Sequence, residues 1–149
     1  MSKVEIATSE SRQIARFMGL PKWKDVDDID LVEWVKRGFP AGTATIVTRR
    51  VDPHERFVRA VDIIPKSSLH RRKDKNLTKD QSESIWALSR VFCEVLRIYS
   101  DDLDRAALFL VNKHPLLGDR SPLSLAKESA AGADLVLRHL AKAEAGVAV

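Results

Sequence analysis

The sequence has few of the features that metal-binding and catalytic proteins share. Its 149 residues include one cysteine, Cys93, so an intramolecular disulfide is excluded and no second thiol is available for a zinc site. The four histidines are scattered, and none lies four residues from another, the helical spacing that favours zinc. The chain also has no Gly-rich phosphate loop and no G-x-S-x-G motif. These absences argue against an enzyme and against a bound cofactor or metal.

Membrane-targeting features are also missing. No run approaches the roughly 18 apolar residues that a membrane span needs, and the first six residues lack the apolar core of a signal peptide. With 44% hydrophobic and 31% charged residues, the chain can bury a core and stay in solution. We therefore expect a cytoplasmic protein of one domain or two small ones, without membrane contact. Cys93 lies in an apolar run and is expected to be buried and inert.

The net charge of +4 is unevenly distributed along the chain. Residues 49–79 contain ten Lys and Arg residues and only four acids, a local net charge of +6 that leaves −2 for the remainder. A basic block in an otherwise mildly acidic chain indicates contact with a polyanion. A solvated charged surface would explain the same block without any partner.

Apolar periodicity and capping signals predict an all-α fold of eight or nine helices. The run Thr-Ile-Val-Thr at 45–48 would suit a strand, but the chain offers no second strand to pair with it. A capping box formed by Thr78 and Gln81 opens the longest helix. Ser100 or Asp101 is expected to cap the next one, and Gly132 to separate the last two. The expected ranges are 9–18, 27–37, 40–50, 53–61, a short helix from 65, 79–99, 101–111, 122–129 and 133–145.

The most informative stretch begins at Asn112 and reads Asn-Lys-His-Pro-Leu-Leu-Gly-Asp-Arg-Ser-Pro-Leu-Ser-Leu. Pro115 cannot continue the preceding helix, Gly118 suits a positive φ, and the Ser-Pro pair supplies a cap and first residue for a new helix. This pattern predicts a tight corner between two helices. Leu116 and Leu117 lie on that corner, where they are either packed into a core or offered to a partner. His114, which precedes Pro115, is expected to be a surface or turn histidine.

This corner, followed by a short helix, a glycine and a terminal helix, resembles the toxin-binding domain of Xre/MbcA/ParS-type antitoxins. The family usually has Leu-Gly-Gly at the turn, whereas the second glycine is Asp119 here. The resemblance extends upstream through residues 64–72 and 77–83 and covers about residues 30–149. Together with the helix pattern, it implies an N-terminal Xre-like helix-turn-helix bundle (residues 1–76) followed by a C-terminal helical toxin-binding domain (residues 77–149).

The resemblance implies that the C-terminal domain binds and inhibits a toxin. The partner would typically be a RES-domain enzyme that consumes NAD, encoded with this chain as a type II toxin–antitoxin system, while this chain itself would need no cofactor. In the family, the C-terminal end of the antitoxin covers the active-site cleft of the toxin. The residues that this places at the toxin are Leu116, Leu117, Gly118, Asp119, Arg120, Glu144, Gly146, Val147 and Val149.

The basic block is interpreted as the DNA-binding part. A helix over 53–61, a tight turn and a short helix from Pro65 would form a helix-turn-helix, with Leu69 facing inward. Ser67, Ser68 and His70 are assigned to base edges, and the phosphate contacts are assigned to Lys66, Arg71, Arg72 and Lys73. The chain would then bind its own operator as a homodimer or within the toxin complex.

Two alternatives remain open. The chain can be a stand-alone helix-turn-helix repressor without a toxin partner, in which case the corner and tail are ordinary packing. It can also be a helical interaction protein whose basic surface is only solvated.

Overall fold

The structure is a computed structural model that describes residues 9–146; residues 1–8, predicted as a loose arm, and residues 147–149, the apolar tail, lie outside the described residues. The described part contains only helices as regular elements, and its β-bridges are isolated, so the predicted all-α fold is confirmed. The α-helices are α1 (Glu10–Phe17), α2 (Asp28–Arg37), α3 (Thr43–Val51), α4 (Lys66–Arg71), α5 (Lys79–Ile98), α6 (Leu103–Val111), α7 (Pro122–Glu128) and α8 (Ala130–Glu144). The 3-10 helices are η2 (Trp23–Asp25), η3 (Ala60–Asp62) and η4 (Pro115–Leu117).

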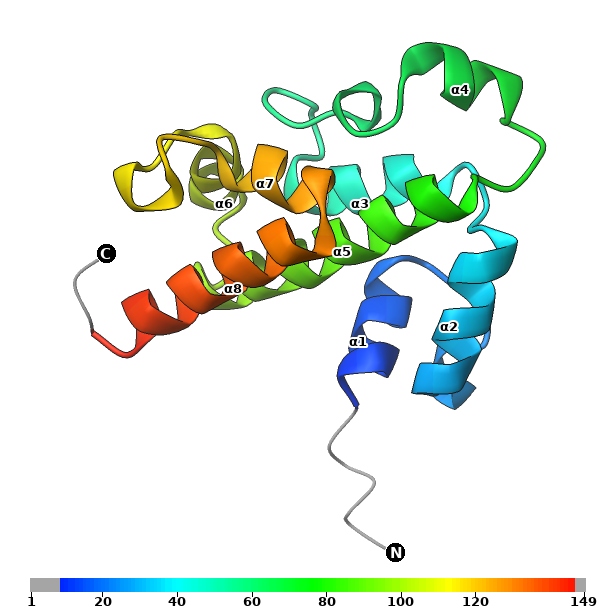
Figure 1. Ribbon diagram of the computed structural model, residues 1–149, viewed down its shortest axis with the longest axis horizontal. Helices are drawn as coiled ribbons and strands as arrows, with labels where there is room; N and C mark the ends of the chain where they lie inside the picture. The colour runs from blue at the N-terminus through cyan, green and yellow to red at the C-terminus, as the bar shows by residue number, and fades with distance from the viewer. Residues whose placement is uncertain (1–8, 147–149) are drawn as a thin grey trace, which may run out of the picture.

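The long helix α5 is the centre of the fold (Figure 1), and it packs against α1, α2, α3, α6, α7 and α8. It begins at the predicted capping box, in which Thr78 accepts the N–H of Gln81 and Gln81 accepts the N–H of Thr78. One hydrophobic core extends from Ile14 to Leu140 and is continuous across the predicted boundary between residues 76 and 77. The division into two functional regions at that boundary stays a prediction.

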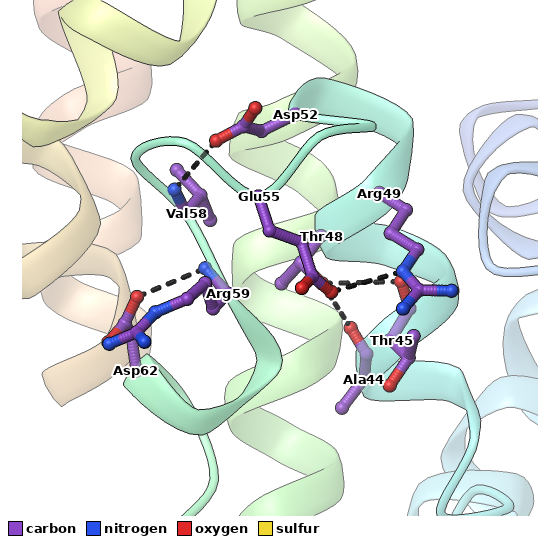
Figure 2. A network of polar contacts seen from close by, with 9 residues as sticks. All are labelled: Ala44, Thr45, Thr48, Arg49, Asp52, Glu55, Val58, Arg59 and Asp62. Atoms are coloured by element: carbon purple, nitrogen blue, oxygen red, sulfur yellow. Dashed lines mark hydrogen bonds and ion pairs between the residues drawn. The ribbon is translucent and has the colours of Figure 1, made fainter.

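The segment after α3 corrects one predicted element, because residues 53–61 do not form a helix. The buried carboxylate of Asp52 accepts the backbone N–H groups of Phe57 and Val58 at 2.6 and 2.9 Å, which draws the chain back into a loop. Figure 2 shows the bond to Val58. Glu55 has a φ of +53°, outside the helical region, and its carboxylate pairs with Arg49 at 3.1 Å. A side-chain cap to backbone N–H groups replaces the expected helix, and only η3 follows before α4.

Burial alone would raise the pKa of Asp52, but the backbone N–H donors of residues 56–58 hold it below its ordinary value. The ionised carboxylate is therefore part of the folded loop, because each N–H stabilises the charged form.

Two further boundaries differ from the prediction. Helix α6 is capped by Asp102, which accepts the N–H of Arg105 at 3.3 Å, whereas Ser100 and Asp101 have φ values of +52° and +61° and form the turn after α5. Gly132 does not separate the last two helices: it lies in the first turn of α8. A Cβ atom at this position would be 2.0 Å from the carbonyl oxygen of Leu125, so the glycine allows α8 to approach α7 closely.

Candidate functional site

The two predicted binding surfaces lie at opposite ends of the long axis of the molecule. The connection between α6 and α7, called here the corner (residues 112–121), and the C-terminal end of α8 are at one end, and α4 is at the other (Figure 1). Helix α5 spans the distance between them. The geometry of each surface can therefore be considered separately.

Backbone hydrogen bonds around His114 fix the shape of the corner. The carbonyl oxygen of His114 accepts the N–H groups of Leu117 at 2.9 Å and Asp119 at 3.0 Å, and its own N–H donates to the carbonyl oxygen of Arg120 at 3.2 Å. Gly118 and Asp119 have φ values of +68° and +55°. Asp is one of the few residues other than Gly that adopts this region at low cost, so the corner keeps two successive left-handed residues although the second glycine is replaced.

The two leucines of the corner have opposite environments. Leu117 is 3% exposed and belongs to the hydrophobic core, while Leu116 is 60% exposed. The packed interpretation therefore holds for Leu117, while contact between Leu116 and a partner stays a prediction. Leu117 anchors η4 to the fold, and Leu116 is presented to solvent on a backbone that hydrogen bonds hold in place.

The side chain of His114 connects the corner to α6 and α8. Its Nε2 atom lies 3.1 Å from the carbonyl oxygen of Phe109, and its ring centroid lies 4.8 Å from the Phe109 ring and 6.2 Å from the His139 ring. Burial, together with the nearby charges of His114 and Lys142, lowers the pKa of His139. His114 is thus a half-buried turn residue with a structural role, in line with its prediction.

The remaining residues predicted at the toxin are held by ion pairs or lie at the chain end. Arg120 pairs with Glu128 of α7. Glu144 pairs with Arg97 of α5 at 2.7 Å, and this hydrogen bond lowers the pKa of the Glu144 carboxyl. Gly146 follows α8 with a φ of +81°, a conformation in which glycine commonly ends a helix. Val147 and Val149 lie outside the described residues.

At the other end, α4 presents most of the residues predicted to contact DNA. Lys66, Ser67, His70, Arg71 and Lys73 are exposed. Leu69 packs against the core as predicted.

Two of the predicted DNA-contacting residues have partners inside the fold. Ser68 is buried rather than facing outward, and its hydroxyl oxygen accepts a hydrogen bond from Arg71 at 3.3 Å. Arg72 is half-buried and donates to the carbonyl oxygen of Asn76 at 3.0 Å. Ser68 therefore supports α4 and is not accessible to a base edge.

Ion pairs within the fold neutralise some cations of the basic block (residues 49–79), so a smaller part of this block remains as unpaired positive charge. Arg49, Arg56 and Arg59 are paired with carboxylates at 3.1 to 3.3 Å. Within the described part of the chain, no carboxylate lies within ion-pair distance of the Lys and Arg residues from α4 to the start of α5, residues 66–79. These unneutralised cations are called here the basic segment: Lys66, Arg71, Arg72, Lys73, Lys75 and Lys79.

The helix-turn-helix was predicted from a helix over 53–61, which the structure replaces by a loop and η3. The nearest α-helix before α4 is α3, which ends at Val51. The DNA-binding role of α4 therefore depends on its charge and exposure, and the helix-turn-helix stays a prediction.

One exposed apolar surface was missed by the sequence analysis. Ile29 and Val32 of α2 are 70% and 60% exposed. The sequence contained a signal for it, since five of the ten residues of α2 are large and apolar, more than one helical face can bury.

Within residues 9–146, no three His, Cys, Asp or Glu side chains are grouped as a metal site requires. Burial raises the pKa of the Cys93 thiol to about 12, so this thiol is a poor nucleophile at neutral pH. None of the helices in the described part is both long and apolar enough to cross a membrane.

The fold is a helical bundle with a hydrogen-bonded corner that exposes Leu116 at one end and the basic segment at the other. Residues 95–146 match the family model of the antitoxin Xre/MbcA/ParS C-terminal toxin-binding domain. This region, from the end of α5 through α8, is therefore similar to the toxin-binding domain of Xre/MbcA/ParS-type antitoxins. The match lies inside the predicted range 77–149 and covers about a third of the chain. A comparison with curated protein sequences finds no significant match.

Proposed function

We propose that this protein is the antitoxin of a type II toxin–antitoxin system, that it inhibits a RES-type NAD-consuming toxin through its C-terminal part, and that it represses its own operon by binding DNA as a homodimer. The observation that carries the proposal is the toxin-binding domain at residues 95–146. The structure supports it, because the corner inside this range exposes Leu116 while the surrounding backbone is fixed.

The surface proposed to meet the toxin consists of the corner and the adjoining end of α8. An exposed leucine on a preformed turn loses little conformational entropy on binding, and a few apolar side chains usually supply most of the affinity of an interface. Asp119 and Arg120 flank Leu116 and would form a polar rim around it. Glu144 and Gly146, at the end of α8, complete the proposed surface, and that end of α8 lies at the same end of the molecule as the corner (Figure 1). Val147 and Val149 are proposed from the sequence alone.

Co-expression with the product of the neighbouring gene tests the toxin-binding part. Growth arrest caused by that product should be relieved by this chain, but not by the variant Leu116→Asp. Ile46 is 39% exposed on α3 and provides a control, since Ile46→Asp introduces the same charge far from the corner. Full rescue by Leu116→Asp would remove the corner from the interface. Unchanged cellular NAD during arrest would refute the RES assignment and leave the antitoxin role.

Binding to the operator is proposed to use the basic segment. Neutralising Arg71, Arg72 and Lys73 together should weaken binding to the upstream promoter fragment and reduce the salt slope by up to about 0.9 for each phosphate that the variant no longer neutralises. A matched control neutralises Arg49, Arg56 and Arg59, which removes the same charge from residues already paired within the fold. Equal effects of the two triple variants in a salt titration would mean that only net charge matters.

The alternative is a stand-alone repressor, which the exposed basic segment would support without a role for the corner. In that case operator binding would depend on the basic segment as above. No product of a neighbouring gene would bind the chain, and co-expression of the chain would relieve no growth arrest.

A further inference from the structure

Helix α2 carries an apolar ridge that the fold does not cover. Ile29 and Val32 lie one turn apart and are 70% and 60% exposed, while Leu31 on the opposite face is 4% exposed. Helix α2 therefore has one apolar face packed on its own protein and a second one open to solvent. Adjacent large apolar side chains left open on a helix mark an interaction surface.

A groove beside this ridge extends the apolar surface. It has a volume of about 890 Å³ and lies between α2 and the junction of α7 and α8, over the N-terminal half of α5. Its apolar lining includes Val32 and Val35 from α2, Trp86 and Ala87 from α5, and Ala130 from the start of α8, and charged side chains of α2, α5 and α7 also line it. A groove of this kind between helices accepts the apolar face of an amphipathic helix whose other residues are charged.

The charges of α2 indicate which helix fits. The first two turns carry Asp28, Asp30 and Glu33, and the last turn carries Lys36 and Arg37. A second α2 placed antiparallel to the first brings its basic end to the acidic end of its partner and opposes the two helix dipoles. A parallel arrangement would bring like charges together. The polarity of α2 therefore makes it complementary to a copy of itself.

We propose that two copies of this chain associate through α2, antiparallel about a two-fold axis near Val32, so that Val32 of each copy enters the groove of the other. Asp28 and Lys36 lie four residues before and after Val32, on the same face of α2. The two-fold axis therefore places Asp28 of one copy opposite Lys36 in the other. Every contact occurs twice, because a two-fold interface is made by the same surface on both copies. The inference identifies the surface of the homodimer and rests on that part of the proposed function.

Sedimentation velocity across a concentration series tests the surface. The wild-type chain should form dimers, and Ile29→Asp combined with Val32→Asp should raise the dimer dissociation constant at least tenfold, the size of effect expected for central apolar contacts. Because both residues are exposed, the helical content and thermal unfolding of the monomer should be unchanged. Ile46→Asp, at an exposed apolar residue of α3, should leave the dissociation constant unchanged.

Charge reversal separates specific pairing from general repulsion. Asp28→Lys and Lys36→Glu should each weaken the dimer, whereas a mixture of the two single variants, or the double variant, should restore it. Asp28 also accepts a hydrogen bond from Ser11 within the fold, so the recovery in the mixture, where that bond is still missing from one chain, identifies the pairing across the interface.

The outcomes distinguish the surface from the dimer itself. A wild-type chain that stays monomeric would overturn both this surface and the proposed homodimer. A dimer that ignores the α2 variants would overturn the surface alone. Neither result affects the toxin-binding domain, which the co-expression experiment tests independently.

Discussion

Substituting the two leucines of the corner one at a time should separate stability from toxin binding. Leu117 is 3% exposed, and replacing a buried leucine by alanine typically costs about 2–4 kcal/mol of unfolding free energy. In a chain of this size, each kcal/mol lowers Tm by about 2–4 °C, so Leu117→Ala should lower Tm by about 5–15 °C. Leu116 is 60% exposed, and Leu116→Ala should change the unfolding free energy by less than about 0.5 kcal/mol.

The order is reversed for toxin binding, which isothermal titration calorimetry with the purified toxin measures. Leu116→Ala should raise the dissociation constant about tenfold or more, corresponding to at least about 1.4 kcal/mol. At a temperature where the Leu117→Ala variant is still folded, its dissociation constant for the toxin should be closer to the wild-type value than that of Leu116→Ala. Urea denaturation of both variants supplies the stability values. If the two substitutions destabilised the fold equally, or if Leu116→Ala left toxin affinity unchanged, the division of roles would be refuted.

Three further predictions concern the fold. Gly132→Ala should lower the unfolding free energy in urea by more than Gly118→Ala, because its Cβ would lie 2.0 Å from the carbonyl oxygen of Leu125, whereas Gly118 has open space and only its φ of +68° costs about 1 kcal/mol. Asp52→Asn should cost about 1–3 kcal/mol at pH 7; this stabilisation is present above pH 3.8 and is lost as pH falls through the lowered pKa. The lowered pKa of His139 means that the unfolded chain binds the proton more tightly, so stability should fall below pH 6.5, and His139→Gln should flatten that part of the pH profile.

Local capping chemistry could be predicted from the sequence because its partners are close in the chain. The box at Thr78 and Gln81 and the cap of α7 at Ser121 need residues only three positions apart. The same holds for the corner, where Pro115 and Gly118 restrict the backbone by themselves. Nearby residues determine the conformation of such elements, and tertiary packing does not change it.

The wrong predictions arise where a distant or buried partner decides the local structure. The sequence 53–61 has helical periodicity, but the buried carboxylate of Asp52 accepts the N–H groups of Phe57 and Val58, and these hydrogen bonds stabilise the loop. Gly132 resembled a helix break, but a backbone approach to Leu125 requires it. In both cases a contact outside the periodic pattern determined the conformation.

The candidate surfaces were predictable in position and less so in detail. The corner and the basic segment were identified by residue type, but which leucine is exposed and which serine of α4 is buried depend on packing against α5 and its neighbours. Sequence periodicity could not reveal these differences, because Leu116 and Leu117 are adjacent and chemically identical. The exposed ridge of α2 was not predicted, because the apolar residues of this helix lie on two faces and the sequence does not show which face the fold leaves uncovered.

The arrangement around α5 gives a physical reason for placing two binding surfaces on one small chain. The end of α8 is tied to α5 by the Arg97–Glu144 pair, and the start of α8 by the Arg90–Asp134 pair at 3.0 Å. Helix α8 also packs along α5, so the end of α8 has a fixed position relative to α5, while α4 lies beyond the opposite end of the same helix (Figure 1). Under the proposed function, a toxin at the corner and an operator at the basic segment would therefore contact opposite ends of the molecule. Such a toxin and operator would not compete for the same residues, and coupling between them would pass through the fold, the proposed α2 interface or the order of assembly.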